Sequence, residues 1–354
     1  MERRTPKGFL NGKTLIIAVV AIAFVVLVIV TARYYARIFA PNVNTEEVQP
    51  ADLYIYTGST LDDVVQTLRD SNLIRNTDSF IWLARRKNYD NHVNPGHYVI
   101  DPGMNNNELI NLLRSGKQTP VNVTFTNVRT LPVLASVVSG QLEADSASIE
   151  GLLNDERFLS SLGMNRYTIP GLFIPNTYEF YWNTGARGFV ERMKKEYDRF
   201  WKGSRMKKAE KIDLTPVEVS TLASIVDEET NMTDEMPRIA GVYINRIKRG
   251  IPLQADPTIR FAMGDFTIRR VLKKQLEIDS PYNTYKFAGL PPGPIRIPSI
   301  VAIDAVLNYE HHNYYYFCAK NDFSGYHAFA RTLAQHNQNA RLYQKALNRR
   351  KILK

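Results

Sequence analysis

The first patterned segment of the chain is an unbroken apolar run close to its beginning. Residues 15–30 carry no polar side chain, and Thr14, Thr31 and Ala32 extend the uncharged stretch to 19 residues. A helix of that length covers roughly 28 Å, close to the thickness of a bilayer core. The pattern predicts a transmembrane helix over 14–32, and no second run of comparable length follows.

Charges beside this run predict its orientation. The residues before it carry four positive charges and one negative charge: Arg3, Arg4, Lys7, Lys13 and Glu2. Positive flanks stay on the cytoplasmic side. We therefore expect 1–13 to be a cytoplasmic tail and the rest to lie outside the inner (cytoplasmic) membrane. A signal peptide cleaved near Ala40 is the alternative, but the apolar run is long for one, and Arg33 and Arg37 follow it closely.

The next segments predict a linker and a small domain. Residues 33–52 show no period and indicate a linker. Short strands are expected near 53–56 and 98–100, with helices from Leu61, over 78–86, and between Asn105 and Gly116. This strand–helix–helix–strand order over 53–120 resembles LysM modules, which bind N-acetylated glycans. A small spacer domain is the alternative interpretation.

Residues 121–354 predict a larger domain. Residues 121–125 alternate apolar and polar side chains as a half-buried strand does. Mostly helical patterns follow, with an aromatic segment, 314–317, that we expect to be a core strand. The predicted fold class is α+β, comprising an N-terminal transmembrane helix, a small LysM-like α+β module and a larger mixed α+β catalytic domain.

Composition narrows the classes of function. Hydrophobic residues make up 44% and charged residues 23%, which excludes wholesale disorder. The net charge of +10 favours nucleic acid or an anionic membrane surface. No nucleic-acid motif is present, so we expect membrane lipid, and not nucleic acid, as a partner. A lone cysteine, Cys318, excludes a disulfide framework and cysteine-based metal sites. With no HExxH, GxSxG, Walker A or GxGxxG motif, we expect neither metal nor cofactor.

One carboxylate stands out from the helical pattern after Pro216. Leu222, Ile225, Val226 and Glu229 share a helix face, since their spacing is i, i+3, i+4 and i+7. A carboxyl on an apolar face is costly to ionise, so its pKa rises and it keeps a proton for general acid catalysis.

The neighbouring acids face other directions on the same helix. The spacing predicts that Asp227 is solvated and that Glu228 falls in between. Two alternatives remain open for Glu229: the helix ends before it, or it forms a buried ion pair with an arginine such as Arg246.

Polar and aromatic residues in later loops are typical of a sugar site. Gln254 and Asp256 lie in an expected Pro-containing turn, and residues 280–285 bring hydroxyls, an amide and two aromatic rings together. Residues 289–294 form a proline-rich loop, and His327 follows the aromatic segment. Sugars need such stacking rings and hydrogen-bonding groups.

Several separate motifs together resemble the endolytic murein transglycosylases, the YceG-like family. The matching segments run in order along the chain: GLFIPNTYEF (171–180), LASIVDEET (222–230), INRI (244–247), LQADPT (253–258), SPYNTY (280–285), GLPPGPI (289–295) and HAFARTLAQHN (327–337). Two positions depart from the expected pattern, since Asp227 stands where Glu is common and Asn176 where Asp is.

The resemblance implies a lyase that cuts peptidoglycan glycan strands internally, between N-acetylmuramic acid and N-acetylglucosamine. It leaves 1,6-anhydro ends, needs no metal and terminates glycan elongation. Glu229 takes the catalytic position. The residues expected to position sugar or Glu229 are Gln254, Asp256, Tyr282, Asn283, Tyr285 and His327. Glycan strands, and by resemblance peptidoglycan synthases, are the implied partners.

Two other functions stay open at this point. A hydrolytic muramidase would use Asp256 or Glu179 as a base that activates water. A non-enzymatic glycan-binding scaffold would recruit cell-wall synthases without any cleavage.

Overall fold

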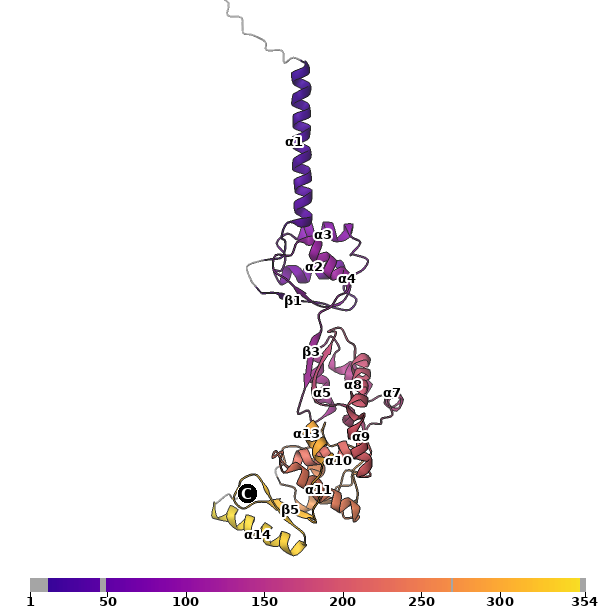
Figure 1. Cartoon of the computed structure of the whole chain (residues 1–354), viewed down its shortest axis with the longest axis vertical. Helices are drawn as coiled ribbons and strands as arrows, with labels where there is room; N and C mark the ends of the chain where they lie inside the picture. The colour runs from indigo at the N-terminus through magenta and orange to yellow at the C-terminus, as the bar shows by residue number, and fades with distance from the viewer. Residues whose placement is uncertain (1–11, 45–48, 269, 351–354) are drawn as a thin grey trace, which may run out of the picture. The chain divides into compact units, whose positions relative to one another are not determined.

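The computed structural model describes residues 12–44, 49–268 and 270–350, so most of the predicted cytoplasmic tail lies outside the described residues. The chain divides into two compact units. The first runs to Val121 and includes residues 181–183; the second comprises 122–180 and 184–354. The predicted mixed α+β class is confirmed, with a long apolar helix near the N-terminus (Figure 1).

Helix α1 (Gly12–Phe39) is longer than the predicted transmembrane segment. Among the described residues, it alone is long and apolar enough to cross a membrane. Its last turns replace part of the predicted linker because they pack on the small module. Asn106 Nδ2 donates to the carbonyl of Arg37 at 2.8 Å, and Ile38 packs against the core of the module.

The module below α1 forms around two antiparallel strands, β1 (Ala51–Ile55) and β2 (Gly96–Ile100), with Leu53 opposite Tyr98. Three helices cover them: α2 (Leu61–Asp70), α3 (Thr77–Arg86) and α4 (Asn106–Ser115). Reciprocal capping boxes fix the starts of α2 and α4, since Thr60 and Asn105 each bond to an acid three residues later. The helices supply apolar faces to one core beneath α1 (Figure 1).

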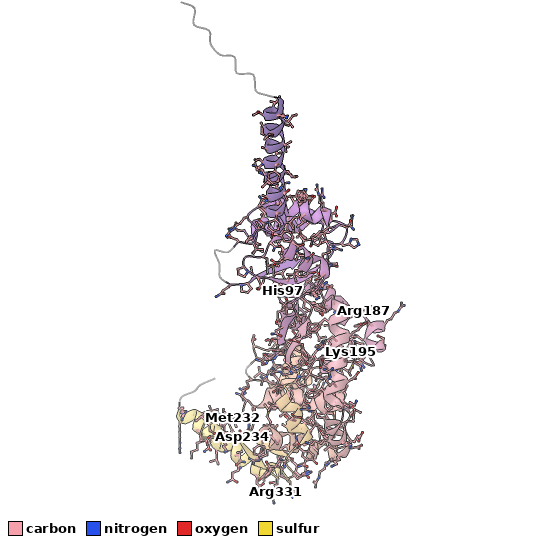
Figure 2. The ribbon with its side chains drawn as sticks, turned by 45° about the horizontal axis from the view of Figure 1, so that its top comes forward. His97, Arg187, Lys195, Met232, Asp234 and Arg331 are labelled. Atoms are coloured by element: carbon pink, nitrogen blue, oxygen red, sulfur yellow. The ribbon has the colours of Figure 1, made fainter. Side chains whose placement is uncertain are left out.

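The second unit begins with a strand pair and a set of helices. Strand β3 (Val121–Phe125) pairs with β4 (Asn176–Phe180). Between and after them lie α5 (Leu131–Ser139), α6 (Ser146–Leu153), α7 (Glu156–Ser161), the 3₁₀ helix η1 (Ile169–Leu172), α8 (Ala186–Trp201) and α9 (Ser204–Lys211). Helix α8 exposes charged side chains of both signs, and Figure 2 shows one of them, Arg187, projecting away from the ribbon.

Helix α10 (Pro216–Glu229) is the central element of this unit. Every residue from Val219 to Val226 is buried, because α13 (Ile300–Leu307), α11 (Met236–Lys248) and α12 (Asp256–Met263) pack around it (Figure 1). The chain ends in the hairpin β5 (Tyr316–Ala319) and β6 (His327–Ala330), on which α14 (Leu333–Arg349) packs, and the short 3₁₀ helix η2 (Lys273–Glu277) precedes α13.

Close backbone approaches hold the helices around α10. Gly241, in the middle of α11, allows the carbonyl of Glu310 to come so near that a Cβ on the glycine would sit 2.4 Å from it. On another side, Ser224 of α10 accepts a 3.0 Å hydrogen bond from the backbone N–H of Ile295, which pins the proline-rich loop. These contacts hold α11 against the segment that carries Glu310, and α10 against the proline-rich loop.

Candidate active site

Glu229 is the last residue of α10, and its position follows from how the helix starts. Thr215 caps the helix, Pro216 takes the first helical position, and Glu218 completes a capping box with a 2.7 Å bond to the Thr215 N–H. Fourteen residues later the helix ends at Glu229. A carboxylate at a helix C-terminus faces the negative end of the helix dipole, which disfavours its charged form.

Tyr243 is the direct partner of Glu229. Its hydroxyl donates a 2.6 Å hydrogen bond to Oε1 of Glu229, and its side chain, only 1% exposed, lies in the middle of α11. Arg246 does not pair with Glu229; its guanidinium donates instead to the carbonyl of Leu253 and to Oε1 of Gln254. The ion-pair alternative for Glu229 is therefore wrong, and so is an early end of the helix.

The surroundings of Glu229 raise its pKa above that of an ordinary glutamate. Burial raises its pKa, and the nearby charge of Asp256 raises it further, whereas the Tyr243 hydrogen bond, His327 and Arg260 act to lower it. Burial is the largest of these causes, so the net pKa of Glu229 is raised. Such a group keeps a transferable proton to a higher pH than an ordinary glutamate does.

The two acids before Glu229 bind neighbouring segments of the second unit. Asp227, predicted to be solvated, is only 10% exposed in its side chain and accepts hydrogen bonds from the N–H and hydroxyl of Ser299, the N-cap of α13. Glu228 forms ion pairs with Arg129 at 2.7 Å and Arg296 at 2.8 Å. The prediction for Asp227 is wrong because the start of α13 covers the side of α10 on which Asp227 lies.

Asp256 begins helix α12 instead of lying in a turn. The Tyr285 hydroxyl donates a 2.5 Å hydrogen bond to Oδ1 of Asp256. Thr284 lies beside Tyr285. Its hydroxyl accepts from the N–H of Ala255 at 3.1 Å, and its carbonyl accepts from the N–H of Gln254 at 2.9 Å. The loop 280–285 is thus bound to the start of α12.

Gln254 occupies an unusual backbone conformation at the same place. Its φ of +52° lies in the left-handed region of backbone conformation, which residues other than glycine seldom adopt. The Arg246 guanidinium fixes its carboxamide at 3.1 Å. Strained residues persist where the surrounding structure over-determines them, and they gather at functional sites.

His327 reaches the site from the first residue of β6. Its ring Nδ1 lies 2.7 Å from Oε2 of Glu235. Its backbone N–H donates to the other carboxylate oxygen of Glu235 at 2.9 Å. The Glu235 side chain is only 2% exposed. Since Nδ1 is engaged, Nε2 is the ring nitrogen that could bind a ligand.

The segment that carries Glu235 also holds the hairpin through a second acid. Asp234 accepts bonds from the Tyr326 hydroxyl at 3.1 Å, and Figure 2 shows Met232 and Asp234 beside the C-terminal segment.

These residues surround a cavity of about 420 Å³. Five of the seven predicted site residues line it: Glu229, Gln254, Asp256, Tyr285 and His327. The aromatic segment 315–317, predicted to be core, forms part of its wall, because β5 keeps one face open. The further lining residues include Tyr243, Arg246, Arg260 and His336.

Tyr282 and Asn283 do not line the cavity. Tyr282 packs against the ring of Phe261 at 4.6 Å. Asn283 is fully buried: its amide donates to the carbonyls of Leu276 and Ile278, and its Oδ1 accepts from the N–H of Tyr285 at 3.0 Å.

A family model described as the YceG-like family matches residues 53–342, and this range includes every residue of the cavity. The chain belongs to the YceG-like family.

Named relatives support the same grouping. This YceG-like chain is 28% identical over 335 residues to the endolytic murein transglycosylase of Bacillus subtilis strain 168, covering 90% of this chain and 91% of that protein. It is 31% identical over 297 residues to the protein of the same name in Streptococcus pneumoniae D39, with 74% of this chain aligned. The chain spans only 53% of that longer relative.

A solved structure also resembles this YceG-like protein. The crystal structure of a putative yceG-like protein from Listeria monocytogenes matches with a TM-score of 0.56 and 27% sequence identity. The match covers 82% of this chain and 99% of that one.

Sequence reasoning missed three residues that the structure makes prominent at the YceG-like site: Tyr243 and Arg260, which line the cavity, and Glu235, which binds His327. Tyr243 lies on the apolar face of α11, where an aromatic residue is typical of a core, so no local signal marked it as a partner of Glu229. Glu235 precedes Met236, the first residue of α11, and bonds to a strand more than ninety positions later. Such pairings arise only when distant segments meet.

Proposed function

We propose that this protein is a membrane-anchored endolytic lytic transglycosylase of peptidoglycan, with Glu229 as its single acid and base. The observation that carries the proposal is a carboxyl with a raised pKa at the wall of a polar, aromatic cavity. The names of its relatives supply the substrate class. The bond cut is the one between N-acetylmuramic acid and N-acetylglucosamine within nascent strands, which makes the enzyme a terminase of glycan elongation.

The proposed reaction uses one carboxyl twice. Protonated Glu229 donates its proton to the glycosidic oxygen as the C1–O bond breaks, so the N-acetylglucosamine side leaves as an alcohol. The resulting carboxylate then takes the proton from the C6 hydroxyl of N-acetylmuramic acid. The C6 oxygen bonds to C1 and closes the 1,6-anhydro ring, and Glu229 is protonated again. No water is consumed, unlike in two-carboxylate hydrolases.

The remaining predicted residues take two roles in this proposal. Gln254, Asp256, Tyr285 and His327 line the cavity and bind sugar hydroxyl and amide groups. Asn283 positions Tyr285 through its backbone N–H, and Tyr282 supports the same loop by packing. Three lining residues have buried nitrogens without a hydrogen-bond partner among the described residues: Arg246 Nε, Arg260 Nε and His336 Nδ1. A polar ligand is a natural partner for such groups.

The test is digestion of purified glycan strands by the full-length protein, with the products weighed by mass spectrometry. We expect ends that lack one water relative to reducing ends, and Glu229→Gln should abolish them while glycan binding persists. Glu156→Gln is the matched control, because Glu156 is an exposed glutamate outside the cavity.

Each rival function predicts a different product. Reducing ends alone would establish the hydrolytic muramidase instead. The non-enzymatic scaffold would be established by two results together: the wild type does not cleave glycan strands, and the Glu229→Gln variant functions in cells as well as the wild type does.

The proposal places α1 across the inner membrane, with residues 1–13 in the cytoplasm and the catalytic domain, 121–354, on the outer side. The module at 53–120 is proposed to be LysM-like and to contact glycan, and synthases are the proposed protein partners.

The Asn106 bond to Arg37 favours an uncleaved anchor, since cleavage near Ala40 would remove that contact. The mass of the protein isolated from membranes tests this: loss of the first forty residues would contradict it.

A further inference from the structure

The first unit has a second cavity, of about 670 Å³, where α1 meets the module. We infer that this cavity binds the phosphodiester headgroup of an anionic phospholipid of the outer leaflet. The inference rests on the proposed anchoring of α1 and on no part of the proposed chemistry. Its walls come from α1 on one side and from the starts of α3 and α4 on the other.

The depth of the cavity fits a headgroup. Val30 ends the apolar run and lines the cavity, and Arg33 and Arg37 line it further along the helix. At 1.5 Å per residue, Arg33 lies about 4.5 Å and Arg37 about 10 Å beyond Val30 along the axis. If residues 15–30 span the hydrocarbon core, the cavity opens at the level where phosphates begin.

The charge of the cavity fits an anion. Arg33 and Arg37 share a face of α1, since they are four residues apart, and Arg75 lines the opposite wall. No carboxylate is among the described residues that line it. Guanidinium groups match phosphate oxygens in bidentate geometry, so Arg33 and Arg37 on one face of α1 are suited to bind a phosphate.

Neutral polar groups complete the wall. Asn76 is the N-cap of α3 and Ser79 lies in its first turn; both line the cavity together with Asn42 and Asn106. These groups are held in place: Asn42 Nδ2 donates to Oδ1 of Asn106 at 2.7 Å, and Asn106 Nδ2 donates to the Ser79 hydroxyl at 2.9 Å. The opposing walls are therefore joined by a fixed network, and the site is preorganised.

Aromatic residues mark the same level as an interface. Tyr34 and Trp82 meet edge to face with ring centroids 4.9 Å apart. The Arg86 guanidinium lies 5.1 Å from the Trp82 centroid, and that of Arg37 lies 5.7 Å from it. Tyrosine and tryptophan rings gather at membrane–water boundaries, and arginine beside them contacts lipid phosphate. This favours a lipid over a free anion, because the acyl chains would lie along α1 before Val30.

The experiment uses the full chain in detergent micelles and native mass spectrometry with equal amounts of phosphatidylglycerol and phosphatidylcholine. We expect wild type to retain the anionic lipid about tenfold more often. The variant R33Q/R37Q/R75Q should lose this preference. The control R69Q/R114Q/K117Q removes three exposed cations of the same unit that do not line the cavity, and should keep the preference.

Two results would overturn the inference: an unchanged preference in R33Q/R37Q/R75Q, or removal of the lipid adducts from wild type by millimolar inorganic phosphate, which would show a site for phosphate alone. Liposome flotation separates these outcomes from failure of the anchor. Wild type that floats but shows no lipid preference contradicts only the headgroup site. Wild type that does not float contradicts the anchoring on which the inference rests.

Discussion

The hydroxyl of Tyr243 donates a 2.6 Å hydrogen bond to Oε1 of Glu229 and so joins the middle of α11 to the end of α10. Both side chains line the cavity. This bond acts against burial, because it favours the charged carboxylate while burial favours the protonated form. The balance of the two sets the pH range in which Glu229 can act as an acid.

Removing the hydroxyl should shift that range. In Tyr243→Phe the carboxylate loses its donor, so the pKa of Glu229 rises further and the basic limb of the pH–activity profile moves to higher pH. We expect kcat to fall by about tenfold, since the carboxyl is also less well oriented. Tyr178→Phe is the control, because that buried hydroxyl donates to the Ile174 carbonyl outside the cavity. A basic limb that stays in place or moves to lower pH would contradict the assignment.

Asp256→Asn should shift the profile in the opposite direction. The Asp256 charge raises the pKa of Glu229, so its removal lowers that pKa and moves the basic limb to lower pH. The asparagine oxygen can still accept from Tyr285. We expect a loss of about tenfold in kcat, whereas loss of a general base in a hydrolytic mechanism would cost about 10² to 10⁴. The pH profile and the mass of the products together decide between these mechanisms.

Glu229→Gln should stabilise the fold at neutral pH. A carboxyl with a raised folded-state pKa binds more protons when folded than when unfolded, so its contribution to stability falls as pH rises between the two values. Glutamine mimics the protonated form at every pH and can still accept from Tyr243. We expect a gain of about 1 kcal/mol in the free energy of unfolding at neutral pH. The gain should vanish below the ordinary pKa of 4.5, where wild type is protonated in both states. Equal stabilities at all pH values would argue against a raised pKa.

Arg296→Leu should destabilise the second unit without touching the cavity. Arg296 lies 2.8 Å from Glu228 and 3.7 Å from Asp227, and its side chain is only 10% exposed. Without Arg296, Glu228 keeps only Arg129 and Asp227 keeps only its hydrogen bonds to Ser299, and breaking a buried ion pair costs about 3 kcal/mol. In the exposed pair of Arg187 and Glu191, 3.8 Å apart, the matched Arg187→Leu should cost less than about 0.5 kcal/mol. Thermal unfolding measures both, and equal losses would contradict the role of the buried pair.

Much of the secondary structure could be predicted from local pattern. The apolar run predicts α1, and the capped, periodic segments predict α2, α3 and α4 within a few residues. These signals are local because hydrogen bonds within a helix and its caps involve residues close in sequence. The bounds of α1 were less accurate, since its last turns are held by Asn106 from a distant helix.

The environments of the neighbouring acids on α10 could not be predicted from local pattern. Helical spacing indicated an apolar environment for Glu229, but it also predicted water around Asp227, which instead caps α13 through Ser299. Spacing describes directions around one helix. It cannot say which of those directions other helices will cover, and here the start of α13 covers the direction that Asp227 faces.

By itself the sequence determined that an apolar helix precedes two folded parts, and that Glu229 lies on the apolar side of a capped helix. Only the tertiary structure decided that Tyr243 is its partner, that Asn283 is buried beneath the loop, and that the aromatic strand lines a cavity. The physical reason is that the pKa and the reach of a side chain depend on atoms brought from distant segments, whose arrangement no local pattern contains.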